Sequence, residues 1–289
     1  METINKESVS QILKSYRKHP LSAILFLLVV ISAVITLTVL IALIAYILIK
    51  GIPNLSPELF EWEYTTENVS MMPAIINTLI ITALSLLFAL PVGICSAIYL
   101  VEYAKRGNKL VSIVRITTET LSGIPSIVYG LFGYLFFNIF LEWSYTILGG
   151  ALTLAIMILP LIMRTTEEAL IAVPDLYREG SFGLGAGKLR TVFRIVLPSA
   201  IPGILAGVIL AVGRIVGETA ALLYPAGTAT KVADGLMSSG RTLAVHMYAL
   251  LNEGLYMDQA YATAVVLLVV VIGINALSGL IAKKVGVKD

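Results

Sequence analysis

Apolar runs as long as a bilayer is thick constrain this chain more than any other feature of its sequence. The first run, residues 21–49, contains no charged side chain, and a helix crosses the apolar part of a bilayer in about 20 residues. The composition agrees, because 58% of the 289 residues are hydrophobic and 13% are charged, whereas a soluble domain carries about 25% charged residues. The sequence predicts an all-α integral membrane protein.

We expect six transmembrane helices. The run at 21–49 is too long for the apolar core of a signal peptide, and no small-residue cleavage site follows it, so we expect it to be retained as an additional N-terminal helix. An even number of crossings returns the chain to its starting side. The expected spans are about 21–49, 74–101, 111–140, 146–164, 202–224 and 260–282.

The positions of the basic residues predict which side each loop faces. Of the 20 Lys and Arg residues, 16 lie in the two tails and in the second-to-third and fourth-to-fifth links, including the flanking helix start. The positive-inside rule places these segments in the cytoplasm. The cytoplasmic segments are then 1–20, 283–289 and a loop of about 164–200, and the external loops are 50–72 and about 225–259.

The second external loop is long, and such loops are usually functional or disordered. Its middle, 243–251, predicts a short amphipathic helix. This helix could receive an external solute-binding protein or could simply cap the helical bundle.

The third span contains Gly123 and Pro125, between Ser122 and Ser126. Both residues free backbone groups that only protein or a water-filled cavity can satisfy inside a membrane. Two interpretations remain open: an ordinary proline kink, or a broken helix of the kind that lines transport sites.

The cytoplasmic loop predicts two helices, at about 176–184 and 187–196, separated by a left-handed stop at Gly185. We expect Pro198 and Pro202 to set the entry into the fifth span. The run from Gly183 to Lys188 is not a nucleotide-binding loop, because Phe182 stands where a Walker A motif needs glycine and Leu189 where it needs Ser or Thr.

The fifth span carries Arg214 near its expected centre, where an arginine costs about 2.5–3.5 kcal/mol on insertion scales and usually faces a cavity. Glu218 lies four residues later, on the same face of an unbroken helix. The two side chains could form an internal ion pair, or Arg214 could bind an anion, since guanidinium matches the oxygens of phosphate or sulfate.

The sequence contains no metal-ligand His/Glu cluster and no Gly-x-Ser-x-Gly elbow of an enzyme.

The predicted cytoplasmic loop, at about 164–200, resembles the EAA loop through which ABC importer permeases contact their ATPase subunits. The spacing from Glu to Gly to Ile-x-Leu-Pro is kept, and Gly and Ser replace the two alanines of that motif. The resemblance implies a type I ABC importer permease fold and a role in ATPase coupling for Glu179, Gly180, Ser181, Gly185, Ile195, Leu197 and Pro198.

Two further blocks, Ser122–Gly133 and Arg214–Leu223, resemble the permeases of phosphate ABC importers, and Ala220 with Leu222-Leu223 is similar to their PstA type. In the outer loop, Leu243–Tyr248 also resembles that type. This resemblance implies a substrate pathway that includes Arg214, Glu218, Thr219, Ser122 and Ser126.

The implied complex contains a PstC-like second permease, a PstB-like ATPase dimer and a PstS-like external phosphate-binding protein in a prokaryotic cell membrane. ATP and Mg²⁺ would be used by the ATPase, and this chain would bind no cofactor, metal or nucleic acid. Two alternatives stay open: a permease for another tetrahedral oxyanion such as sulfate or molybdate, and a membrane protein with a signalling or structural role.

Overall fold

The computed structural model describes residues 20–105 and 107–285, and every regular element in these ranges is a helix. The predicted tail 1–20, apart from Pro20, and residues 286–289 lie outside the described residues. The chain divides into two units, Met1–Lys50 and Gly51–Asp289. Helix α2 (Pro20–Gly51) accounts for the described part of the first unit, and its Leu, Ile, Val and Phe side chains are mostly exposed. A helix that is apolar on all sides is suited to lipid.

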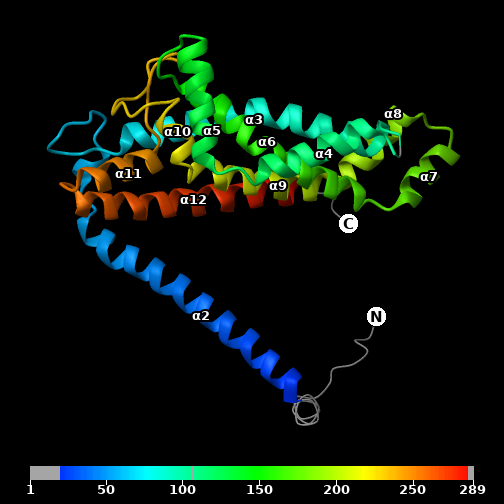
Figure 1. Ribbon diagram of the computed structural model, residues 1–289, viewed down its shortest axis with the longest axis horizontal. Coiled ribbons are helices and arrows are strands. Elements are labelled where there is room, and N and C mark those ends of the chain that lie inside the picture. Colours follow the sequence, from blue (N-terminus) through cyan, green and yellow to red (C-terminus); the bar gives the residue numbers. More distant parts are fainter. Residues whose placement is uncertain (1–19, 106, 286–289) are drawn as a thin grey trace. The chain divides into compact units, whose positions relative to one another are not determined.

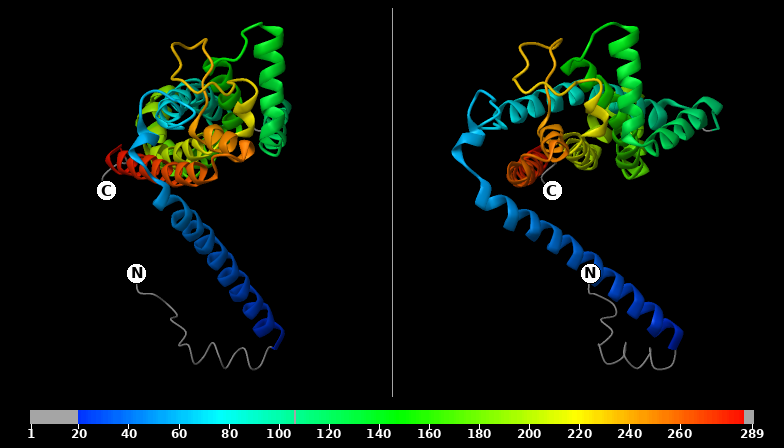
Figure 2. Two further views of the ribbon diagram at one scale, coloured as in Figure 1. Left: turned by 90° about the vertical axis from the view of Figure 1, so that its left-hand side faces the viewer. Right: turned by 60° about the vertical axis from the view of Figure 1, so that its left-hand side comes forward.

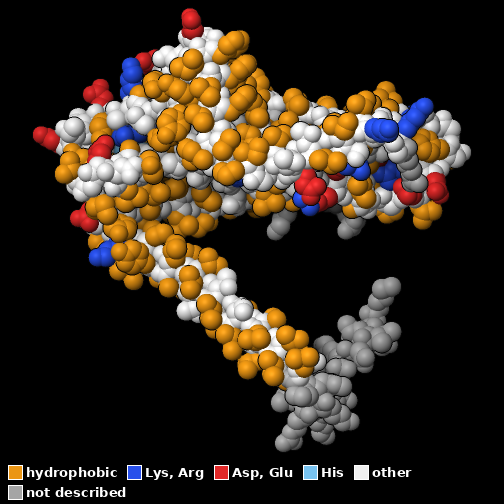
Figure 3. Space-filling view, in the orientation of Figure 1, with side chains coloured by type: hydrophobic (Ala, Val, Ile, Leu, Met, Phe, Trp, Pro, Cys, Tyr) orange, Lys and Arg blue, Asp and Glu red, His pale blue; other side chains and the backbone are white. Residues whose placement is uncertain are grey.

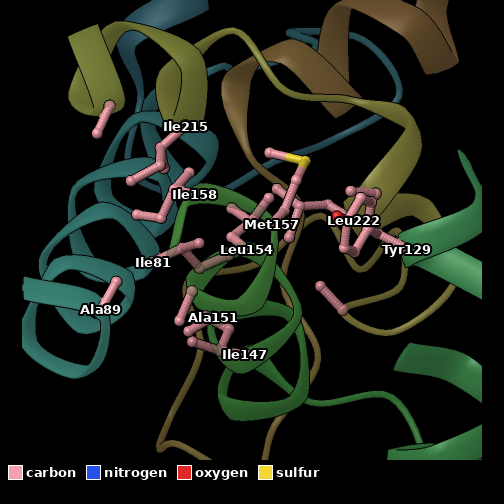
Figure 4. Close-up of a cluster of buried hydrophobic side chains, with 14 of the residues drawn as sticks. Ile81, Ala89, Tyr129, Ile147, Ala151, Leu154, Met157, Ile158, Ile215 and Leu222 are labelled. Carbon is pink, nitrogen blue, oxygen red and sulfur yellow. The ribbon is translucent and has the colours of Figure 1, made fainter. Parts of the chain in front are cut away.

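The second unit is built around α6 (Ile147–Ile171), which packs against α3 (Met72–Ile98) and α9 (Leu197–Val216). Helix α12 (Met257–Val285) packs on α9, and the four helices run side by side (Figure 1). The contact of α3, α6 and α9 buries a cluster of hydrophobic side chains (Figure 4). Leu154 and Ile158 of α6 are fully buried there, against Ile81 of α3 and Ile215 of α9.

Five helices of the described residues are long and apolar enough to cross a membrane, and a bent pair supplies a sixth span if it is counted as one. The helices correspond to the six predicted spans when the bent pair is counted as one, and two of them end at other residues than predicted. Helix α6 continues to Ile171, beyond the predicted end at residue 164. Helix α9 ends at Val216, before the predicted end at residue 224, because the apolar residues that follow belong to a separate short helix.

The bent pair is the third span. Helix α4 (Lys109–Ser122) meets α5 (Ser126–Gly133) and the π-helical turn that follows, Tyr134–Phe140, at an angle of 102°. Gly123 ends α4, and Pro125 begins α5. Helix α5 consequently stands steeply against the four bundle helices in all views (Figures 1 and 2). This geometry supports the broken-helix interpretation over an ordinary proline kink.

The two predicted functional loops lie at opposite ends of this unit (Figure 1). One end holds α7 (Asp175–Gly183) and α8 (Lys188–Thr191). The other end holds α11 (Leu243–Glu253), which contains the predicted helix 243–251, and the irregular segment 225–242. Basic side chains gather at the α7 end, whereas hydrophobic side chains cover the flank formed by α5 (Figure 3).

The segment 225–242 is ordered by hydrogen bonds. The Asn77 side chain of α3 donates to the carbonyls of Lys231 and Arg241 and accepts from the backbone N–H of Ala233. The first N–H groups of α6, at Ile147 and Leu148, donate to the carbonyls of Ser238 and Leu236. The segment thus satisfies helix-terminal donors that would otherwise lack partners.

Candidate functional site

The coupling helix α7 forms almost where the sequence placed it. It begins at Asp175, after Pro174, and ends at Gly183, against a prediction of 176–184. Gly185 adopts a φ of +80°, which confirms the predicted left-handed stop. The helix and its stop therefore follow from local sequence signals.

Arg178 holds α7 against the bundle. Its guanidinium donates to Glu102 at 2.7 Å, to Asp175 at 3.2 Å, and to the carbonyls of Leu170 and Val173 at 2.9 and 2.8 Å. The side chains of Arg178 and Glu102 are 15% and 8% exposed. A planar guanidinium bound to several acceptors at once fixes orientation as well as position. The sequence does not indicate this role, because Glu102 lies 76 positions away along the chain.

The predicted coupling residues divide into exposed and internal ones. Glu179, Gly180 and Gly185 are exposed, and the α-carbons of both glycines face open space. Ser181 is buried, and its hydroxyl lies 2.8 Å from the Thr191 hydroxyl, so it joins α7 to α8 rather than facing a partner.

Several large apolar side chains of this loop are exposed. Leu176, Phe182, Leu184 and Leu189 are all exposed, with Leu184 at 91%. Exposed apolar side chains that gather at one place commonly mark a protein contact.

The remaining coupling residues, Ile195, Leu197 and Pro198, are half-buried at the start of α9. The expected separate helix 187–196 is not separate: helical structure runs from Lys188 to Val216. A π-helical turn at Val192–Val196 precedes Pro198, and the Ser199 hydroxyl donates to the Ile195 carbonyl. Such turns and side-chain bonds satisfy the backbone groups that a proline leaves open.

Arg214 lies in the last turn of α9, which ends at Val216. Because the helix ends at Val216, Glu218 does not continue the Arg214 face, and the expectation that the two share one was wrong. Within the described chain they form no ion pair. Glu218 instead accepts from the Ala221 N–H at 3.1 Å and caps α10 (Ala220–Leu223).

The structure brings the two blocks with a phosphate-permease pattern together, because α5 packs directly on α10. At Gly130 a β-carbon would lie 2.6 Å from the Ala220 carbonyl oxygen, so only glycine permits this approach. Tyr129 is buried beside this contact and donates to the Leu121 carbonyl at 2.7 Å, across the break in the third span.

The other expected pathway residues lie around this contact. Ser122 is exposed and donates to the Glu119 carbonyl, whereas Ser126 and Thr219 are half-buried. The arrangement is a half-buried arginine at a helix end, next to two breaks in helical structure.

A second polar group at the α11 end was not singled out by the sequence. Arg241 is 4% exposed, and its guanidinium lies over the Tyr64 ring at 4.9 Å. His246 of α11 is fully buried, with its ring edge-on to Tyr64. The only hint in the sequence is that Arg241 is one of few basic residues on the predicted external side.

Residues 89–287 match the family described as the binding-protein-dependent transport system inner membrane component. The chain belongs to this family. It is therefore a component of a binding-protein-dependent transport system in a cell membrane, and a transport protein rather than an enzyme.

Similar proteins agree with this assignment. A probable ABC transporter permease protein of Bacillus subtilis, YqgI, is 35% identical over 79% of this chain and 82% of its own length. The phosphate transport system permease protein PstA of Haemophilus influenzae is 34% identical over 75% of this chain and 77% of its own. The PstA of Pasteurella multocida is 41% identical over 61% and 63%.

Solved structures show the same fold at low identity. A bacterial ABC transporter for alginate, solved with its periplasmic protein, contains a chain with a TM-score of 0.70 at 16% identity, covering 94% of this chain and 98% of that one. The MetNI methionine ABC transporter contains one with a TM-score of 0.57 at 20% identity, covering 84% and 97%. The ABC importer permease fold expected from the sequence is confirmed.

Proposed function

We propose that this chain is the permease subunit through which an ATP-driven importer carries inorganic phosphate into the cell. The observation that carries the proposal is the contact between α5 and α10. It joins the two sequence blocks with the phosphate-permease pattern beside Arg214, in a chain whose relatives include PstA permeases.

The state of Arg214 supports an anion pathway. The side chain is half-buried, and within the described residues it has no hydrogen-bond or ion-pair partner, since Glu218 caps α10. A guanidinium presents donors in a planar fork that matches the oxygens of a tetrahedral oxyanion. In this proposal Arg214 binds the phosphate in passage, with Thr219, Ser122 and Ser126 near its path.

ATPase coupling takes place at α7. Its exposed apolar side chains supply the contact, and the Arg178 anchor makes the helix rigid enough to transmit displacement to α3 and α6. The ATPase is a separate PstB-like dimer that uses ATP and Mg²⁺, and α7 lies on the cytoplasmic side, as do both termini.

The complete importer then contains a PstC-like permease that forms the other wall of the pathway. A PstS-like binding protein delivers phosphate at the α11 end, where Tyr248 and Leu251 are exposed.

The test is uptake of radiolabelled phosphate by the complex in proteoliposomes. Arg214→Gln should abolish uptake while the ATPase subunit still co-purifies with the permease. Lys231→Gln is the matched control, because Lys231 pairs with Asp234 and both side chains are exposed. Normal uptake by Arg214→Gln would refute the pathway role. Wild-type uptake of sulfate or molybdate in place of phosphate would assign the permease to another oxyanion.

A further inference from the structure

The α11 end of the second unit contains an open cavity of about 450 Å³. Its walls come from the first external loop, the segment 225–242 and α11, and include Tyr64, Thr230, Arg241, Asn252 and Glu253. These elements are far from α7, at the opposite end of the unit (Figure 1). Leu223 of α10 also lines the cavity, which therefore adjoins the α5–α10 contact, but Arg214 is not among its lining residues.

Arg241 is the unusual member of this wall. The residue is 96% buried, yet its Nε and Nη2 atoms have no hydrogen-bond acceptor in the structure. The guanidinium lies over the Tyr64 ring in a cation–π contact, and this stacked position leaves these two nitrogens without an acceptor. A buried donor without an acceptor is costly, and one on a charged group more so. The site therefore lacks an acceptor that a ligand would supply.

The other cavity walls are suited to an oxyanion. Thr228 and Thr230 offer hydroxyls, and Asn252 offers an amide, all of which can donate to oxygen. Glu253 is the one opposing charge among the cavity residues, and it is exposed, so water screens it. Its negative charge weakens the binding of an anion without preventing it.

We propose that this cavity binds a tetrahedral oxyanion through Arg241, as a holding site at the outer end of the permease. The oxyanion is inorganic phosphate if the proposed function holds, on which this identity rests. The holding site would take phosphate from outside before it reaches Arg214, and a site of modest affinity suits this role, because a transported ion must also leave.

The test is equilibrium dialysis of radiolabelled phosphate with the assembled complex in nanodiscs, without the external binding protein. All variants carry Arg214→Gln, so that the pathway site is removed and the outer site is measured alone. Adding Arg241→Gln should weaken phosphate binding at least about tenfold, since a hydrogen-bonded charge is lost. Lys231→Gln, which removes the same charge from the same segment, should leave phosphate binding unaltered.

A variant that is expected to tighten phosphate binding shows that a change in binding does not come from misfolding. Glu253→Gln removes the opposing charge and should tighten phosphate binding by about threefold, in line with a solvent-screened charge. A misfolded cavity could not bind more tightly. Unchanged binding in both Arg241→Gln and Glu253→Gln would overturn the proposal.

Two further results distinguish this proposal from the proposed transport function and from binding of a lipid phosphate group. If the wild-type complex transports no phosphate but Arg241-dependent oxyanion binding persists, the proposed function fails and the holding site stands. If binding appears only in nanodiscs free of anionic lipid, a lipid phosphate group occupies the cavity, and the proposal of a free oxyanion is overturned.

Discussion

The two ends of the helical unit hold their loops in different ways. At the α7 end, one charged side chain, Arg178, ties a short helix to the bundle and leaves apolar side chains exposed. At the α11 end, neutral groups that are fully buried, Asn77 and Thr78, bind the loop backbone. A short helix that is held by one polar anchor and exposes apolar side chains is suited to transmit movement from a partner protein. Several buried neutral bonds suit a loop that keeps its position.

The largest effect that tests this comparison is expected from Arg178→Ala. It leaves the Glu102 carboxylate, 8% exposed, without its partner, and breaking a buried ion pair costs about 3–5 kcal/mol. We expect a lower thermal midpoint of the purified complex and loss of substrate-stimulated ATPase activity.

Arg190→Ala, on the exposed surface of α8, is the matched control and should change neither quantity. The double variant Arg178→Ala with Glu102→Gln should recover much of the midpoint, because the unpaired charge is gone. A midpoint for Arg178→Ala equal to that of the control would show that Arg178 is no anchor.

The next effect is expected from Asn77→Ala. The substitution leaves the carbonyls of Lys231 and Arg241 and the N–H of Ala233 without this partner, and each unsatisfied buried group costs about 1–3 kcal/mol. Hydrogen exchange should rise across 231–243 and stay unchanged in α7. Thr82→Ala, on the same helix, changes a buried hydroxyl that has no hydrogen bond and serves as control. Equal protection of 231–243 in both variants would contradict the role of Asn77.

A smaller effect depends on pH. Burial, and then the charge of Arg241, lower the pKa of His246 from 6.5 to about 3. Between pH 6.5 and 3, His246 therefore binds a proton in the unfolded chain but not in the folded chain. The contribution of His246 to the free energy of unfolding is fully present above pH 6.5 and is lost as the pH falls through this range.

The expected loss at pH 5.5 is about 1.4 kcal/mol relative to pH 7.5, from the value of one pKa unit. Thermal midpoints at the two pH values measure it. His246→Phe has no proton to bind and should lose less on acidification than the wild type. An identical loss in both would show that His246 does not contribute.

The sequence predicted those features that depend on neighbouring residues. Helix α7, the stop at Gly185 and the break at Gly123–Pro125 all follow from local signals, and the EAA-like spacing identified the loop. The end of α9 was missed because apolarity continues through Ala220–Leu223, across the break at Gly217. The contacts of Arg178 with Glu102 and of Asn77 with Lys231 join residues 76 and 154 positions apart, and no local pattern indicates them.

The most local effect, confined to α7, is expected at Gly185. Its φ of +80° costs a residue with a β-carbon about 1–2 kcal/mol, although nothing within 4 Å would obstruct that carbon. Gly185→Val should therefore change the angle of α7 relative to α8 and weaken capture of the ATPase subunit in a pulldown, and it should lower the thermal midpoint by no more than this cost accounts for. Gly187→Val is the matched control, since Gly187 also faces open space but has a φ of −75°. If both variants capture the ATPase equally well, the angle set by Gly185 is not what the ATPase recognises, and the exposed apolar side chains alone carry the contact.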